Sequence, residues 1–497
     1  MNSFFFFSHS HQIKWYSAFA GAIKECLPNS KIVLFVHGED DYFYAEQFES
    51  YDVIIDLIDG FSFNPKLELQ NLKISASIVA LETDLDTSFF WEDMKVDRYI
   101  RAKDNPSFSV QYINFAFNVF EKAYQRERPI LGFGESTMAI YRLAHHAFDR
   151  DGLSYIAPMS NRYSDRFYFE DDWYWSWNNC LRLYEDYRKD GIPDDLVQIT
   201  NATYERLAVR GTKPVAFEDF QKTQKVGYIP LRTLSMLARF ISVVKNLTTL
   251  KADYFRNNVR YSIIEKTLLS KVSRMIKNYY DHFKYSRLFS EKVISNQAYS
   301  IYFLHFQPEY TVDSLGKFYH DQVNLISNIA SSIPADQILY VKEHPAMVGL
   351  RSSEYYSRIV SLTNVVLLHH DIDSLELIKA SEIVFSIVGT VGLEATFNNK
   401  PAIMFGRYAF SDIGTSSFCS SIWDLGRLIR LKLGHGYEDE LEMVQVIKAL
   451  LAAKYAGSYP GKIPISDATV DPFCNDEEQF KLVVEAMRLE LVARHIL

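Results

Sequence analysis

Three short polar segments in the second half of the chain combine residue types that bind phosphate. His305 and Gln307 follow one apolar run, His344-Pro345 follows a second, and Gly389-Thr390-Val391-Gly392 follows a third. A glycine-containing turn that opens a helix offers free backbone N–H groups and the positive end of the helix dipole to an anion. Imidazole and hydroxyl groups add further hydrogen-bond donors. The three segments together predict a phosphate site.

Each residue of this predicted site has an expected role. His344 is expected to donate to the phosphate, because Pro345 restricts its loop. The turn at Gly389 is expected to bind the same group, with help from Ser386. Glu394, one turn into the helix, would accept from ribose hydroxyls, and Glu343 is a second candidate for ribose or base. The predicted set is His305, Gln307, Glu309, Lys342, Glu343, His344, Pro345, Ser386, Gly389, Thr390 and Glu394.

Each of these segments also has a purely structural interpretation. The glycine pair suits any strand-to-helix turn, a single histidine is often a buried structural residue, and the residues after the first run could stabilise their own loop. In the first half of the chain, Glu135 opens a helix after an apolar run. It either complements the helix dipole or acts as a catalytic carboxylate.

Short apolar runs alternate with helical patterns around the predicted site. This alternation is typical of βαβ units and a parallel sheet. The polar segments then all lie at the carboxyl ends of strands, where open α/β sheets bind ligands. The expected strands are Tyr299–Leu304, Gln337–Val341, Ile383–Val388 and Ala402–Phe405, and the expected helices are Asp321–Ser332, Ser352–Leu362 and Ser374–Ser381.

The first half of the chain shows the same alternation, which predicts a second doubly wound α/β domain. The fold class is therefore α/β. The expected strands are Phe4–Phe7, Lys31–Val36, Tyr51–Asp56, Ser75–Ala80, Pro129–Phe133 and Leu153–Pro158, and the expected helices are Gln12–Cys26, Val110–Arg126 and Met138–Phe148.

Composition narrows the class of protein. A chain of 497 residues suits two or three domains. A net charge of −9 argues against general nucleic-acid binding. The 4 cysteines form no CxxC pair, so neither a metal site nor a disulfide framework is expected. No apolar stretch reaches the ~18 residues of a membrane span, and the expected location is the cytoplasm.

A basic segment lies between the two halves. Residues 221–290 contain 14 Lys or Arg against 3 Asp or Glu, on a mostly helical pattern. One interpretation is a solvated helix face. The other is a surface for an anionic partner, either the inner membrane leaflet, which would make the protein peripheral there, or an acidic glycan.

Several of these segments resemble the bacterial capsule polysaccharide biosynthesis glycosyltransferases. The resemblance is strong over about 299–410 and weaker over 115–170. It implies a GT-B architecture, in which two Rossmann-like doubly wound domains face each other across a cleft. The segments that carry it are Leu304–Glu309, Tyr340–Pro345, Gly389–Ala395, Lys400–Gly406, Gly134–Thr137 and Arg162–Phe169.

The patterns along the chain, together with the resemblance over its two halves, predict an organisation of the chain. An N-terminal domain for acceptor and catalysis is expected at 1–200, and a basic helical arm at 201–295. A nucleotide-sugar domain is expected at 296–435, and C-terminal helices at 436–497 that pack back on the first domain.

The family's relatives use CMP-activated 3-deoxy-octulosonate (Kdo), so the expected co-substrate is a CMP-ulosonic acid, with no metal or other cofactor. The acceptor would be a glycan or glycolipid. Glu135 would be the general acid or base, and Asp171 or Asp172 the nucleophile of a double displacement. Two alternatives stay open: a GT-B enzyme that uses a UDP-sugar, such as a 2-epimerase, and a non-catalytic partner subunit of capsule assembly.

Overall fold

The described residues of the computed structural model form two compact units. Unit 1 contains those up to 171 and from 459 onward, and unit 2 contains those from 178 to 456. The basic segment 221–290 lies outside the described residues, apart from 286–290. The structure describes 2–9, 12–67, 71–97, 105–134, 138–160, 166–171, 178–206, 286–291, 293, 297–307, 311–347, 351–407, 411–434, 440–456, 459–460 and 477–497.

Unit 1 is built on a seven-stranded sheet in the order β13-β6-β5-β4-β1-β2-β3. β6 runs antiparallel to β5 and β13, and the remaining neighbours are parallel. The strands are β1 (Ser3–Phe7), β2 (Lys31–Val36), β3 (Val53–Asp56), β4 (Leu131–Gly134), β5 (Ser154–Ser160), β6 (Arg166–Glu170) and β13 (Tyr459–Pro460).

The central strand β1 shows why this sheet is covered on both faces. Phe4 and Phe6 belong to one core cluster, and Phe5 and Phe7 belong to another. All four side chains are fully buried. Because side chains alternate along a strand, four consecutive phenylalanines need an apolar layer on each side of the sheet.

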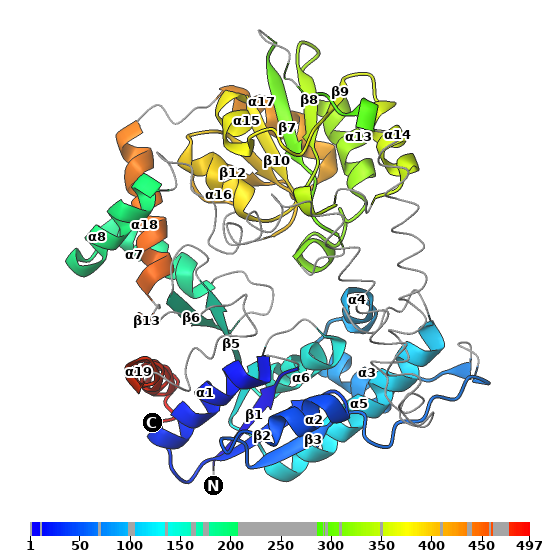
Figure 1. Ribbon diagram of the computed structural model, residues 1–497, viewed down its shortest axis with the longest axis vertical. Coiled ribbons are helices and arrows are strands. Elements are labelled where there is room, and N and C mark those ends of the chain that lie inside the picture. The colour runs from blue at the N-terminus through cyan, green and yellow to red at the C-terminus, as the bar shows by residue number, and fades with distance from the viewer. Residues whose placement is uncertain are drawn as a thin grey trace. The chain divides into compact units, whose positions relative to one another are not determined.

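The helices of unit 1 supply these two layers (Figure 1). α3, α4, α5 and α6 contribute to the cluster around Phe5 and Phe7, whereas α1 and α19 contribute to the cluster around Phe4 and Phe6. The helices are α1 (Gln12–Cys26), α2 (Glu39–Ala45), α3 (Ala76–Asp84), α4 (Phe90–Val96), α5 (Pro106–Glu127), α6 (Ala139–Arg150) and α19 (Glu477–Ala493).

One strand prediction in unit 1 is wrong. Residues 75–80 were expected to form a strand, but they form the start of helix α3. Ile78 and Leu81, three residues apart, are its buried side chains, and this spacing places them on one helix face. A short apolar run does not distinguish the two structures, and here packing on the core selects the helix.

Unit 2 is built on a six-stranded parallel sheet in the order β12-β11-β10-β7-β8-β9. The predicted strands correspond to β7, β8, β10 and β11, whereas β9 and β12 were not predicted. The predicted α/β class with two Rossmann-like domains is thus confirmed. The strands are β7 (Tyr299–Phe303), β8 (Ile338–Lys342), β9 (Val365–Leu368), β10 (Ile383–Ser386), β11 (Ala402–Met404) and β12 (Ser416–Phe418).

Helices connect these strands, and three further helices pack on one another. Of the latter, α18 contacts both α7 and α8, and all three belong to unit 2. The helices of unit 2 are α7 (Asn178–Asp190), α8 (Asp194–Tyr204), α13 (Gln322–Ser332), α14 (Ser353–Val360), α15 (Ser374–Ala380), α16 (Thr390–Phe397), α17 (Leu425–Gly434) and α18 (Glu440–Ala456), with short 3-10 or π turns at 286–288, 311–315, 345–347 and 422–424.

The observed division of the chain differs from the predicted one in two places. α7 and α8 group with unit 2, although the N-terminal domain was expected to continue to residue 200. Of the C-terminal helices, α19 packs against α1 of unit 1, whereas α18 belongs to unit 2. Among the described residues, none of the helices has the length and apolar character needed to span a bilayer.

Candidate functional site

The candidate site lies at the carboxyl ends of three neighbouring strands of unit 2. The chain passes from β7 to β8 on one side, whereas β10 pairs with the other side of β7. The order of the sheet therefore reverses between β7 and β10, and such switch points are where open α/β sheets bind ligands. His305 follows β7, His344 follows β8, and Ser386 ends β10.

Hydrogen bonds determine the tautomer of His305. The backbone N–H of Ile387 donates to His305 Nε2 at 3.0 Å, and Ser386 Oγ lies 3.1 Å from the same nitrogen. Because a backbone N–H can only donate, Nε2 must carry the lone pair, and the proton of the neutral ring is on Nδ1. Burial and the charges of His344 and Arg351 lower the pKa of His305 to about 3. His305 is therefore a neutral donor through Nδ1 at pH 7.

The turn at Gly389 faces this imidazole. Gly389 has a φ of +109°, a backbone conformation that is nearly exclusive to glycine. A Cβ at this position would lie 4.0 Å from His305 Cε1, so turn and ring border the same space. Helix α16 starts at the next residue, Thr390. Its first N–H groups can donate to an anion bound in this space, beside the imidazole of His305.

The loop after β8 adds the second histidine. Pro345 opens a short 3-10 turn, and the ring of His344 lies 6.1 Å from the ring of Phe306 in the neighbouring loop. Burial and the charges of Arg351 and Lys342 lower the pKa of His344 to about 4. Like His305, this imidazole is neutral near pH 7.

Two predicted ligand residues are engaged within the protein instead. Glu343 is 1% exposed, and its carboxylate accepts from Tyr356 Oη at 2.7 Å and from the backbone N–H of His344 at 2.6 Å. Lys342 is also buried, and its Nζ donates to Ser374 Oγ at 3.0 Å. These contacts are with the protein, whereas contacts with a nucleotide were expected. Both side chains therefore stabilise the loop after β8.

The other predicted residues stand at the edge of the site. Thr390 Oγ1 donates to Glu394 Oε1 at 3.1 Å, so the half-buried carboxylate lies over the first turn of α16. Gln307 Nε2 donates to the carbonyl of His320 at 2.7 Å. Glu309 lies outside the described residues.

Gln322, at the start of α13, was not predicted. It is 1% exposed, and its amide accepts from the backbone N–H of His305 at 2.8 Å and donates to the His305 carbonyl at 3.2 Å. It also donates to Gln307 Oε1 at 2.6 Å. The sequence did contain a signal for this residue: Gln322 lies three residues before Leu325, on the apolar face of the helix. A polar side chain on such a face needs a buried hydrogen-bond partner.

The predicted catalytic residues belong to the first part of the chain. Glu135 and Asp172 lie outside the described residues. Asp171 is half exposed, and Arg494, directly after α19, donates to its two oxygens at 2.5 and 3.1 Å. Arg494 also donates to Ser154 Oγ at 2.6 Å. Asp171 therefore attaches the C-terminal helix to unit 1, and a role as nucleophile stays a prediction.

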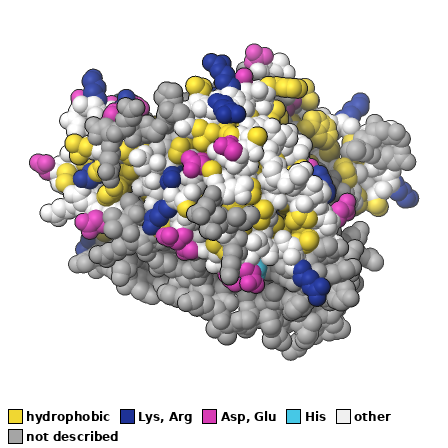
Figure 2. All heavy atoms as spheres, turned by 90° about the horizontal axis from the view of Figure 1, so that it is seen from above, with side chains coloured by type: hydrophobic (Ala, Val, Ile, Leu, Met, Phe, Trp, Pro, Cys, Tyr) yellow, Lys and Arg dark blue, Asp and Glu magenta, His cyan; other side chains and the backbone are white. Residues whose placement is uncertain are grey.

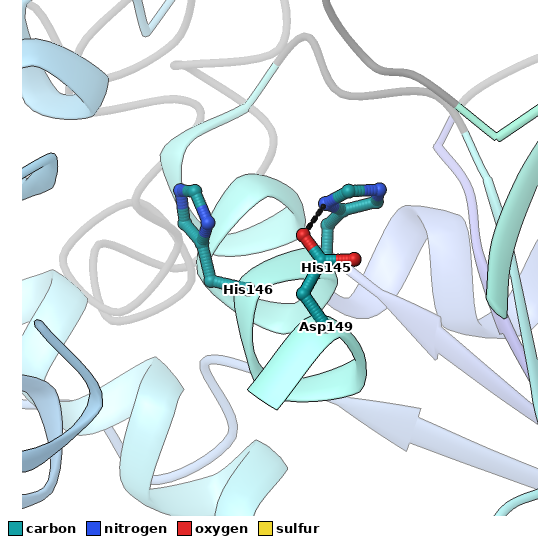
Figure 3. A group of neighbouring side chains, drawn as sticks. All are labelled: His145, His146 and Asp149. Atoms are coloured by element: carbon teal, nitrogen blue, oxygen red, sulfur yellow. Dashed lines mark ion pairs between the residues drawn. The ribbon is translucent and has the colours of Figure 1, made fainter. Parts of the chain in front are cut away.

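A second group of titratable side chains lies on α6, where His145, His146 and Asp149 place ligand-type atoms within 4.8 Å of one another (Figure 3). His145 Nδ1 is paired with Asp149 at 3.1 Å, and its Nε2 lies 3.1 Å from the carbonyl of Asp171. His146 stacks on Phe89 with ring centroids 3.7 Å apart. These contacts account for both histidines as packing residues of unit 1.

Comparison with known proteins gives one family. Residues 247–417, which include the whole candidate site, match the family described as capsule polysaccharide biosynthesis protein. No curated protein matches the chain.

Solved structures match at low similarity. The beta Kdo 2,7 transferase KpsC of Thermosulfurimonas dismutans is 11% identical over 45% of this chain and 66% of its own, with a TM-score of 0.25. The beta Kdo 2,4 transferase KpsC of the same organism is 10% identical, and the match covers 66% of this chain and 81% of that transferase, with a TM-score of 0.33. A putative UDP-N-acetylglucosamine 2-epimerase of Listeria monocytogenes is 10% identical, and the match covers 92% of this chain and 94% of that protein, with a TM-score of 0.25.

The resemblance predicted from the motifs is confirmed: residues 247–417, the region that carries the candidate site, match the capsule polysaccharide biosynthesis protein family.

Proposed function

We propose that this protein is a glycosyltransferase of capsule or other cell-surface polysaccharide biosynthesis, with a nucleotide-activated sugar as donor. The observation that supports this most directly lies at the β7/β10 switch point, where the imidazole of His305 and the turn at Gly389 border one space. This arrangement suits the phosphate of a nucleotide. The family match of the same region supports the polysaccharide pathway.

The proposed donor is a CMP-activated ulosonic acid such as Kdo, and the acceptor is a glycan or glycolipid. A CMP-sugar carries one phosphate, whereas a UDP-sugar carries two. The donors of the site are neutral imidazoles, backbone N–H groups and hydroxyls, and the nearby cations Arg351 and Lys342 are buried. Neutral donors at a helix start suit a single phosphate charge, and no metal is needed in this proposal.

Glu135 is the proposed general acid or base, with Asp172 or Asp171 as nucleophile. Peripheral membrane contact through residues 221–290 is a separate proposal, and liposome sedimentation at low and high salt tests it. Nucleic acid is not a proposed partner. Basic and acidic side chains are interspersed on the face shown in Figure 2, and the net charge is −9.

Thermal unfolding with CMP, UDP, GDP and inorganic phosphate tests the proposed donor. A ligand at 100 times its Kd stabilises by about 2.7 kcal/mol, which raises the Tm by several degrees. We expect CMP to shift the wild type, and the shift to be lost in His305→Ala and His344→Ala. His370→Ala, at the end of β9 in the same sheet, is the control and should keep the shift.

The other outcomes separate the alternatives. A shift with UDP instead of CMP would retain the nucleotide site and refute the CMP donor. No shift with any nucleotide would favour the non-catalytic partner subunit.

A further inference from the structure

Arg351 joins the two loops that carry His305 and His344. It lies just before α14 and is 6% exposed. Its Nη2 donates to the backbone carbonyl of His305, and its Nε lies 3.1 Å from Glu343 Oε2. One guanidinium therefore bonds to the loop after β7 and to the loop after β8.

The contact with Glu343 extends to His344. Glu343 Oε1 accepts from the backbone N–H of His344 at 2.6 Å, and Oε2 accepts from Tyr356 Oη at 2.7 Å. An unbroken series of hydrogen bonds thus runs from the His305 carbonyl through Arg351 and Glu343 to the His344 amide. A planar guanidinium with several fixed donors holds such partners at set distances, which a lysine cannot do.

We propose that Arg351 is a positioning residue of the nucleotide site, which sets the spacing of His305 and His344 through the His305 carbonyl and Glu343. In this proposal it does not itself contact the ligand, because its Nε and Nη2 are bonded within the protein and its side chain is buried. The aromatic ring of Tyr355, 4.6 Å from the guanidinium carbon, covers it further. The proposal rests on the proposed function for the choice of ligand.

Arg351 has a second, electrostatic effect on the same two residues. Burial is the main cause of the low pKa values of His305 and His344, and the positive charge of Arg351 lowers both further. A cation next to an imidazole disfavours the imidazolium form. The buried arginine therefore helps to keep both histidines as neutral N–H donors.

Three variants test this role. Arg351→Met alone would leave Glu343 buried without its counter-ion and could unfold the protein. The double variant Arg351→Met/Glu343→Gln removes both charges; the amide oxygen can still accept from the His344 N–H, and the amide nitrogen can donate to Tyr356 Oη. Arg351→Lys keeps the charge and loses the planar fork. Arg358→Met, on the exposed side of α14, is the matched control, since its side chain is 54% exposed.

Two measurements separate positioning from mere stability. The first is titration of the histidine side chains by 15N NMR without ligand, and the second is the Kd for CMP by calorimetry. For the double variant we expect His305 and His344 to titrate at higher pH than in the wild type, and the CMP affinity to fall about tenfold. In Arg351→Lys, both histidines should still titrate at low pH, whereas the affinity for CMP should fall. Arg358→Met should change neither the histidine titration nor the CMP affinity.

Unchanged titration and unchanged CMP affinity in the folded double variant would overturn the proposal. If the wild type does not bind CMP, the proposed donor is wrong, and the NMR titration alone then decides the role of Arg351. A double variant with wild-type titration would refute the role in that case as well.

Discussion

At the scale of single residues, the site depends on histidines that are kept neutral. The Ile387 N–H donates to Nε2 of His305, so Nδ1 carries the proton of the neutral ring, and the ring borders the Gly389 turn. Burial lowers the pKa of both His305 and His344. In the proposed function, N–H dipoles and helix-end groups would bind the anion, rather than titrating cations.

These low pKa values predict how stability depends on pH. An unfolded histidine has a pKa near 6.5, against about 3 and 4 in the folded state for His305 and His344. Between about pH 4 and 6.5 the unfolded chain binds more protons, so stability is complete above pH 6.5 and is lost as the pH falls. Each histidine should cost up to about 2 kcal/mol at pH 5 relative to pH 7.

Urea unfolding at both pH values measures this loss. His305→Gln, which cannot titrate, should lose less stability than the wild type between pH 7 and pH 5. His320→Gln, at an exposed position, is the control, and its stability should fall between pH 7 and pH 5 by the same amount as that of the wild type. Equal losses for wild type and His305→Gln would contradict the neutral buried imidazole.

At the scale of elements, buried polar contacts connect neighbouring segments. Gln322 of α13 bonds to the backbone of His305 on both its N–H and its carbonyl. In unit 1, Arg142 of α6 pairs with Asp93 of α4 at 2.9 Å, and both side chains are at most 1% exposed. Since α6 follows the segment that contains Glu135, this ion pair anchors the helix next to the predicted catalytic residue.

The buried pair predicts a large and asymmetric mutational effect. Arg142→Met leaves the buried Asp93 carboxyl group without its arginine and with the His146 imidazole 3.4 Å away, and should cost about 3–5 kcal/mol. The double variant Arg142→Met/Asp93→Leu removes both charges and should cost much less. Arg150→Met, which breaks an exposed pair with Asp151, should cost less than about 1 kcal/mol.

Chemical denaturation of the four proteins decides this. A double variant that is as unstable as Arg142→Met would show that packing of the arginine stem, rather than the buried charge, determines the loss.

At the scale of the whole molecule, the two units carry different predicted functions. The described phosphate donors all belong to unit 2, whereas Glu135, Asp171 and Asp172 belong to the part of the chain assigned to unit 1. The proposed reaction therefore needs both units, and nucleotide binding alone needs only one.

This division predicts where CMP protects the backbone. Hydrogen exchange should slow most in residues 303–307 and 386–394 of unit 2, where the donors lie, and should change little in β2 and β3 of unit 1. Protection confined to unit 1 would move the nucleotide site to the other sheet.

Local patterns were sufficient for much of this protein. The alternation of apolar runs and helices predicted the parallel core strands of both sheets, because strand and helix periods are properties of neighbouring residues. The segments at His305, His344 and Gly389 lie together as predicted, since parallel strands share one carboxyl edge. The helix at 76–84 was missed because short apolar runs suit either structure.

Only the tertiary structure decided which polar residues are available to a ligand. Lys342 ends β8, and Glu343 lies between it and His344, yet both are buried and bonded within the protein. Arg351 and Gln322, which no motif marked, hold the histidine loops. Burial and hydrogen-bond partners come from segments far apart in the sequence, so residue type and spacing alone cannot separate the side chains that bind from those that position them.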